Sequence, residues 1–257
     1  MSAPIARERR HTLIFLDEIR STVPVFLDTE VDMTAVQRHR DATRPDGHRY
    51  SLVTYVLFAA GRVLAAHPQA NAAIRGRFRP RVARYAEVSG KLTLDKTLNG
   101  QRIVLAAVIP GLHRASLAEI QENIRRYQTA DPAVASEFGG ARMLHRLPRP
   151  LAALAYRAAV RPLGRRPEVF GTFALTSLGH RPVDGFHSVG GTTVTIGVGR
   201  MADRPAVRDG RLTIAPLMRV SLTFDHRVID GAEAADVLAD LKTALEDFKS
   251  ETDEVRA

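Results

Sequence analysis

Hydrophobic and polar positions along the chain predict a mixture of helices and strands. Residues 52–66 are apolar nearly all round, which predicts a buried helix that begins at the capping residue Ser51. Residues 23–32 and 218–224 alternate apolar and polar side chains, a pattern typical of strands with one solvated face. The other predicted helices cover 9–20, 117–127, 151–160 and 232–248, and the other strands cover 81–96, 102–109, 173–179 and 192–201.

Turn and cap residues delimit these elements. Asn-Gly at 99–100 and Asp-Gly at 209–210 predict hairpin turns, and Ser116 with Glu119 predicts a capping box. Gly197 and Gly199 within a strand predict a close approach to the backbone. No repeat or flexible linker divides the chain. We therefore expect one α/β domain over 1–257, an α+β two-layer sandwich with a mixed β-sheet covered by helices. An atypical Arg- and Pro-rich insertion covers 128–170, and a frayed tail covers 249–257.

Composition excludes several classes of protein. The chain has 257 residues, 45% hydrophobic and 25% charged, which is ordinary for a globular domain. It has no Cys, so disulfides, cysteine-ligated zinc, iron–sulfur clusters and a catalytic thiolate are excluded. No apolar run is long enough for a membrane span, and the N-terminus has no signal-peptide pattern, so we expect a cytoplasmic protein. We expect no metal.

The net charge of +9 comes from two segments. Residues 142–166 contain seven Arg and residues 75–84 contain five, and neither segment contains an acid. Either segment can form a rim that attracts the phosphates of a substrate or a solvated surface, and 142–166 can also form an amphipathic element for a membrane or partner. Nucleic acid is not expected, because aromatic interleaving and a DNA-binding motif are both missing.

The strand 218–224 leads into the turn DHRVIDG at 225–231 and then into a helix. A histidine at this place, His226, is well positioned as a general base, and Asp230 can pair with a cation or cap the helix. The motif alone leaves two interpretations equally open, since a helix-cap turn with a bystander histidine has the same residues.

The turn resembles the signature of the acyltransferase core of 2-oxo acid dehydrogenase complexes, and that of the chloramphenicol acetyltransferases. Further segments in the same order are similar to that family: Arg9-Arg10 before an apolar helix, LAAHPQANAAI at 64–74, GTFALTSLG at 171–179 and VTIGVGRMADRPAVRDGRL at 194–212. The resemblance covers most of the chain and implies a chloramphenicol-acetyltransferase-like fold.

The resemblance also implies a mechanism. His226 would be the general base for attack on an acyl thioester, and Thr176 would donate a hydrogen bond to the oxyanion. Asp230 would form an ion pair with Arg10 that orients the turn. The family transfers the acyl group directly between coenzyme A and its acceptor, at a site between subunits of a homotrimer. A second His-x-x-x-Asp-Gly begins at His180, where Pro182 favours a loop, so we expect His180 at most to touch substrate.

The chain departs from the family where the lipoyl arm enters. The Gly-Leu-x-x-Pro-Val segment is poorly kept, no lipoylation site is present, and 128–170 is longer than the usual connector. We therefore expect a free-standing O-acetyltransferase that uses acetyl-CoA and a small-molecule hydroxyl, such as a natural-product tetronate. Two alternatives remain: a dihydrolipoyl acyltransferase core, and a catalytically silent trimeric scaffold.

Overall fold

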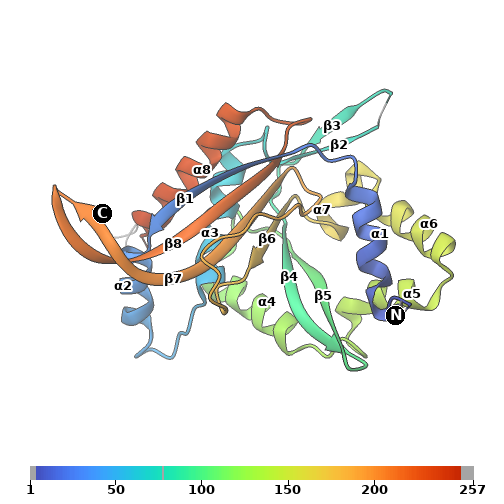
Figure 1. Cartoon of the computed structure of the whole chain (residues 1–257), viewed down its shortest axis with the longest axis horizontal. Helices are drawn as coiled ribbons and strands as arrows, with labels where there is room; N and C mark the ends of the chain where they lie inside the picture. Colours follow the sequence, from blue (N-terminus) through green and yellow to red (C-terminus); the bar gives the residue numbers. More distant parts are fainter. Residues whose placement is uncertain (1–3, 77, 250–257) are drawn as a thin grey trace.

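The computed structural model describes residues 4–76 and 78–249. Six strands form one mixed sheet in the order β1-β8-β7-β6-β4-β5, in which β6 runs parallel to β4 and β7 and the other pairs are antiparallel. The strands are β1 (Pro24–Asp32), β4 (Gly90–Leu98), β5 (Gln101–Ile109), β6 (Phe173–Ser177), β7 (Val194–Arg208) and β8 (Arg211–Asp225). The predicted mixed sheet covered by helices is confirmed (Figure 1).

The core lies between this sheet and a group of helices. Alternate strand residues such as Leu92, Leu175 and Phe224 are fully or almost fully buried and join the apolar side chains of the helices in one cluster. The helices are α2 (Thr34–Thr43), α3 (Leu52–Ala66), α4 (Leu117–Thr129) and α8 (Gly231–Glu246). Burial of the apolar face of each strand therefore sets the register of the sheet.

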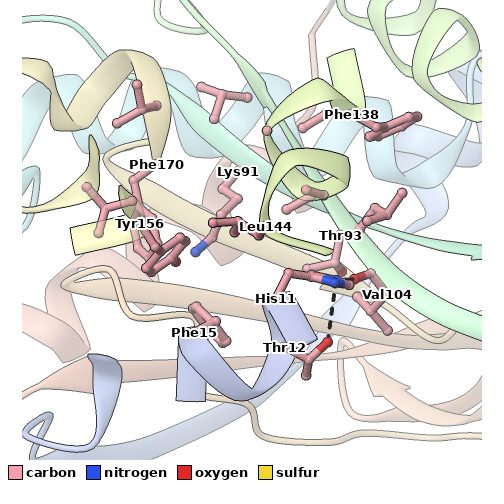
Figure 2. A pocket seen from close by; sticks show the side chains of 18 of the residues that line it. His11, Thr12, Phe15, Lys91, Thr93, Val104, Phe138, Leu144, Tyr156 and Phe170 are labelled. Carbon is pink, nitrogen blue, oxygen red and sulfur yellow. Dashed lines mark hydrogen bonds between the residues drawn. The ribbon is translucent and has the colours of Figure 1, made fainter. Parts of the chain in front are cut away.

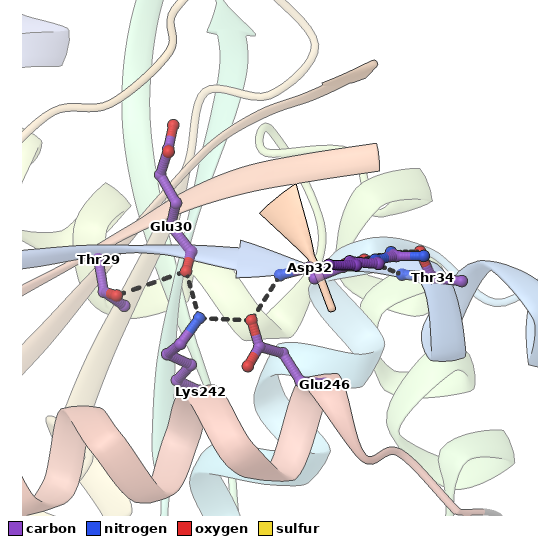
Figure 3. Close-up of polar contacts among 7 residues, drawn as sticks. Thr29, Glu30, Asp32, Thr34, Lys242 and Glu246 are labelled. Atoms are coloured by element: carbon purple, nitrogen blue, oxygen red, sulfur yellow. Dashed lines mark hydrogen bonds and ion pairs between the residues drawn. The ribbon is translucent and has the colours of Figure 1, made fainter. Parts of the chain in front are cut away.

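Polar contacts fix the last helix on the edge strand (Figure 3). The Lys242 ammonium on α8 donates to the Glu30 carbonyl of β1 at 2.7 Å, and the Glu246 carboxylate accepts from the Asp32 amide at 2.8 Å. Asp32 in turn accepts from Thr34 at the start of α2. These bonds fix the position of α8, the helix that begins directly after the turn that carries His226.

Within the insertion at 128–170 only 151–160 was predicted to be helical, and the structure shows further helices there. The insertion folds into helices that pack with the first helix beside the β4–β5 edge (Figure 1). The elements here are η1 (Arg7–Arg9), α1 (Arg10–Ile19), η2 (Ser136–Phe138), α5 (Gly139–Arg146), α6 (Arg149–Val160), η3 (Leu163–Arg165) and α7 (Arg166–Val169). Arg149 bonds to Asp17 at 3.2 Å, and Arg157 and Arg161 bond to Glu18 at 3.3 and 2.6 Å. Several arginines of the second basic segment therefore hold the insertion on α1.

Two pairs of strands project from the body (Figure 1). One is the outer half of the β7–β8 hairpin, where Val207, Leu212 and Ile214 are 73–79% exposed. The other is an arm of β2 (Ala72–Arg75) and β3 (Arg81–Arg84), which carries the first basic segment. On this arm Arg75, Arg79, Arg81 and Arg84 are exposed.

Local predictions hold where local chemistry decides. The helix over 52–66 has the predicted bounds, the capping box is present, and both hairpin turns have positive φ at both residues. The helix α2 was not predicted. Residues 250–257 of the predicted frayed tail lie outside the described residues. None of the helices in the described ranges is long and apolar enough to cross a membrane.

Candidate active site

The turn after β8 presents His226. The Val228 amide donates to the Asp225 carbonyl at 2.9 Å, which closes a tight turn, and α8 begins at Gly231. The His226 amide donates to the Val23 carbonyl at 2.9 Å, so the turn is tied to the segment that leads into β1. The His226 side chain is 44% exposed. The strand therefore holds the backbone while the ring reaches solvent.

The strongest polar contacts of the turn are made by the carboxylate of Asp225, its first residue. Asp225 is 5% exposed and accepts from Arg227 Nε at 2.9 Å and Nη2 at 2.5 Å. It also accepts from the Val23 and Arg227 amides at 3.3 and 3.2 Å. Sequence reasoning assigned no role to this pair. In the sequence the pair is visible only as an acidic and a basic residue at the end of a strand, a combination that is common in ordinary turns.

Asp230 lies beside the predicted base. Its Oδ1 is 3.4 Å from His226 Nδ1, and its side chain is 88% exposed. Although Asp230 occupies the N-cap position of α8, its side chain makes no capping hydrogen bond. Nδ1 is therefore the ring nitrogen that faces the Asp230 carboxylate.

Within one chain, the expected ion pair between Arg10 and Asp230 is not formed. Arg10 Nη1 instead donates to the carbonyls of His145 and Leu147, both at 3.2 Å. The reason is distance: Arg10 begins α1, whereas His226 is tied to Val23 after the end of that helix, and ten helical residues span about 15 Å. In this chain the ion pair at the turn is Asp225–Arg227.

Thr176 lies near the end of β6, well away from His226 in the same chain. It pairs with Gly197 of β7, which pairs with Ser221 of β8. His226 follows Ser221 by five residues, about 17 Å along the strand. The two strand spacings between β6 and β8 add about 10 Å across the sheet. Thr176 and His226 of one chain therefore cannot contact the same reacting group.

The second His-x-x-x-Asp-Gly forms a surface loop, as predicted from Pro182. His180 is exposed, and Asp184 bonds to Arg200 at 2.6 Å and to Arg204 at 2.8 Å. The arginines hold the pKa of Asp184 below its usual value, the Arg200 bond being the main cause. The loop crosses β7 where a Cβ on Gly199 would lie 2.0 Å from a loop carbonyl, which confirms the predicted close approach.

An apolar cavity of about 700 Å³ lies beside Thr176, and we call it the α1–α6 cavity. Residues of three neighbouring strands form its floor, among them Lys91, Thr93, Val104, Ala106, Val108 and Thr176. The walls come from α1, α5, α6 and α7, including Phe15, Leu144, Tyr156 and Phe170 (Figure 2). Residues of the 128–170 insertion thus cover this face of the sheet.

A second cavity of about 660 Å³ adjoins the first, and Thr176 and His180 both line it. The structure thus brings Thr176 together with His180 at one place, and His226 together with Asp230 at another. Within the described residues, no group of three or more histidine, aspartate and glutamate side chains is arranged to hold a metal ion.

Comparisons with known proteins agree with this architecture. Residues 144–251 match the profile of the family described as 2-oxoacid dehydrogenases acyltransferase (catalytic domain). A segment of 52 residues is 48% identical to the dihydrolipoyllysine-residue acetyltransferase component of the pyruvate dehydrogenase complex of Bacillus subtilis (strain 168). The match spans 20% of this chain and only 12% of that protein.

Solved structures share the fold over nearly the whole chain. A probable dihydrolipoamide acetyltransferase from Listeria monocytogenes 4b F2365 has a TM-score of 0.71 at 18% identity, over 98% of this chain and 96% of that one. The cubic core of a pyruvate dehydrogenase multienzyme complex has a TM-score of 0.70 at 21% identity, over 96% and 91%. The fold and the resemblance predicted from sequence are confirmed.

Proposed function

Because residues 144–251 carry the catalytic-domain signature of the 2-oxoacid dehydrogenase acyltransferases, we propose that the protein is an acyltransferase that uses a coenzyme A thioester. The observation that carries the proposal is the His226 turn: a half-exposed imidazole at the end of a buried strand, with Nδ1 facing a carboxylate. A catalytically silent scaffold would not need a base held in this way.

The chemistry is direct acyl transfer. His226 Nε2 takes the proton from the acceptor thiol or hydroxyl as that atom attacks the thioester carbonyl. Thr176 Oγ donates a hydrogen bond to the oxygen that gains negative charge. The carbon–sulfur bond to coenzyme A then breaks, and the imidazolium returns its proton to the leaving thiolate. The acyl group moves to the acceptor, and His226 ends as a neutral base.

The separation of Thr176 from His226 supports a site shared by two subunits. We infer that His226 of one chain works with Thr176 of another, within a homotrimer. The exposed Val207, Leu212 and Ile214 of the projecting hairpin offer an apolar contact surface for such an assembly. The related fold of a cubic enzyme core is consistent with it.

Co-expression of two inactive variants tests the shared site. We expect His226→Ala and Thr176→Ala to be inactive or nearly so when each is purified alone. Random mixing in a ring leaves about one quarter of the interfaces with both groups intact, so about a quarter of the wild-type rate returns. Mixed assemblies that stay inactive would exclude a site between subunits.

The arm β2–β3 suits the phosphates of coenzyme A. Thr193 Oγ1 donates to the Ala72 carbonyl at the base of the arm at 2.5 Å, and the Asp225 amide donates to the Thr193 carbonyl at 2.9 Å. The exposed arginines of the arm therefore project from a base that is linked through Thr193 to the start of the His226 turn. We expect Arg79→Ala with Arg81→Ala to raise the KM for acetyl-CoA with little change in kcat.

The acyl acceptor is either a thiol or a hydroxyl. The comparisons favour a dihydrolipoyl thiol over the hydroxyl of a natural product, because the similar proteins are dihydrolipoyl acyltransferases. The test is release of free coenzyme A from acetyl-CoA with dihydrolipoamide in one arm and a panel of alcohols in the other. Turnover in either arm supports an acyltransferase and identifies the acceptor.

The same assay tests the base. We expect His226→Ala to lower turnover by about 10²–10⁴-fold, the usual range for a general base. Retained turnover in this variant would move the role to another group, with His180 the first candidate. No turnover by the wild type in any arm would support the scaffold instead.

A further inference from the structure

A buried lysine stands on the floor of the α1–α6 cavity. Lys91 is 6% exposed, and its ammonium donates to the Gly190 carbonyl at 2.5 Å. The same ammonium lies 3.5 Å from the centre of the Phe170 ring and 5.0 Å from that of Phe15. Figure 2 shows the side chain reaching between these walls toward Tyr156. One backbone carbonyl and two rings leave part of its donor capacity unused.

A second cation lies close to the same ring. The Arg166 guanidinium is 4.6 Å from the centre of the Phe170 ring and donates to the Gly191 carbonyl at 2.6 Å, while its Nε is buried without a partner. Among the described residues neither cation forms an ion pair. Of the acids on the cavity wall, Glu137 pairs with Arg126 at 3.7 Å and Glu168 is exposed.

A buried lysine beside a partly buried arginine, neither in an ion pair within the described residues, carries a desolvation cost. Burial is the main reason that the pKa of Lys91 falls well below its usual value of 10.5, and the charge of Arg166 lowers it further. A bound anion would offset both effects. The cavity therefore has an electrostatic reason to bind a negatively charged group at Lys91.

The rest of the cavity selects an apolar molecule. Its lining is mainly aliphatic and aromatic, and its volume is in the range of small-molecule sites. Lys91 and Thr93 lie on the same face of β4, about 7 Å apart along the strand. Thr93 is level with Thr176 on the neighbouring strand β6. The Ser188 hydroxyl on the lining is buried without a partner and can orient a polar group. A chain that reaches from Lys91 to Thr176 would run along this floor.

We propose that the α1–α6 cavity binds the acyl acceptor as a free apolar carboxylic acid, with its carboxylate on the Lys91 ammonium and its reacting thiol or hydroxyl beside Thr176. This inference rests on the proposed acyl transfer. It adds that the acceptor is a small acid and that an amide-linked or esterified form of the same chain is a poorer ligand. The insertion at 128–170 supplies most of the walls that make this selection.

Binding of two matched probes tests the site without any reaction. Octanoate and octanamide have the same chain and differ in the charged group. We expect calorimetry to show octanoate binding to the wild type about 10–100-fold more tightly, the range for a hydrogen bond to a charged group. Lys91→Met should abolish this preference. Lys96→Met is the matched control, because Lys96 is on the same strand but donates to the Gln128 and Ala130 carbonyls outside the cavity.

A second variant keeps the test decisive if Lys91→Met does not fold. Ala155→Leu adds volume to the α6 wall and should weaken both probes while octanoate stays the tighter ligand. Equal binding of the two probes to the wild type would overturn the proposal. So would a preference for octanoate that survives in folded Lys91→Met.

Kinetics separate this inference from the proposed function. With acetyl-CoA as donor, Lys91→Met should raise the KM for dihydrolipoate at least about 10-fold and leave that for dihydrolipoamide unchanged. If Lys91→Met instead raises the KM for succinyl-CoA alone, Lys91 recognises a donor carboxylate and the inference is wrong. Octanoate binding without any release of coenzyme A would leave the acid site standing and refute the acyl transfer.

Discussion

Replacing Asp225 should destabilise the protein more than any other change at the His226 turn. The Asp225 carboxylate accepts from the Arg227 guanidinium and from two backbone amides, one of them in the segment before β1. Removing one partner of a fully buried pair costs about 3–5 kcal/mol. The Arg227 side chain is 33% exposed and can be rehydrated, so we expect about 2–3 kcal/mol for Asp225→Ala. For a chain of this size this loss corresponds to a melting temperature about 4–12 °C lower.

Thermal and urea unfolding of two alanine variants gives the measurement. Asp230→Ala is the matched control, because it removes the same group five residues later from a side chain that is 88% exposed. We expect its melting temperature to stay close to that of the wild type. A double-mutant cycle of Asp225→Ala with Arg227→Ala should show coupling, since the two side chains are in contact. If Asp225→Ala and Asp230→Ala shift the melting temperature equally, the assignment of the turn-holding pair is wrong.

Two further predictions concern pH and packing. Burial, the largest influence, lowers the pKa of His67, but the carboxylates of Asp240 and Glu233 raise it above its usual value near 6.5. A histidine whose pKa is higher in the folded than in the unfolded state stabilises the fold at a pH below the unfolded-state pKa. This stabilisation is lost as the pH rises through the folded-state pKa. We therefore expect urea unfolding to show that His67→Gln costs more stability at pH 5.5 than at pH 8.5. Gly199→Ala should lower the melting temperature, because the added Cβ would lie 2.0 Å from a backbone carbonyl. Gly140→Ala in α5 has open space around the added Cβ and should raise the melting temperature slightly. Equal shifts in the two variants would refute the close-approach argument.

The predicted elements that hold are those with strong local signals. The helix over 52–66 combines an unbroken apolar run with Ser51, whose hydroxyl accepts from the Thr54 amide at 3.2 Å. Asn99 and Gly100 have φ of 51° and 76°, as their turn type requires. By contrast, α2 buries only Val36 among its ten residues, and its position depends on packing against α8. Its own sequence gives too weak a periodicity to predict it.

The site was predictable only to the extent that it is local. The turn at 225–231 has its motif and its neighbouring elements within a short segment, so the position of His226 follows from the sequence. The Arg10–Asp230 pair is not formed within one chain, because it depends on where the two ends of α1 lie relative to β8. A resemblance transfers residue types readily, but it does not transfer a contact between segments more than two hundred residues apart.

The polar face of β4 shows why the cavity escaped prediction and why it bears on specificity. Lys91, Thr93 and Asp95 alternate with Gly90, Leu92 and Leu94, which by itself indicates a solvated face. The structure instead covers Lys91 and Thr93 with α5, α6 and α7. The arginines of 142–166 make that segment look like a solvated surface, but Arg157 and Arg161 bond to Glu18 of α1. The His226 turn lies after β8, whereas most of the cavity walls come from residues 128–170. Under the proposed acyl transfer, a change in 128–170 would alter acceptor binding without moving His226, so a Lys91 or Ala155 variant should change KM before it changes kcat.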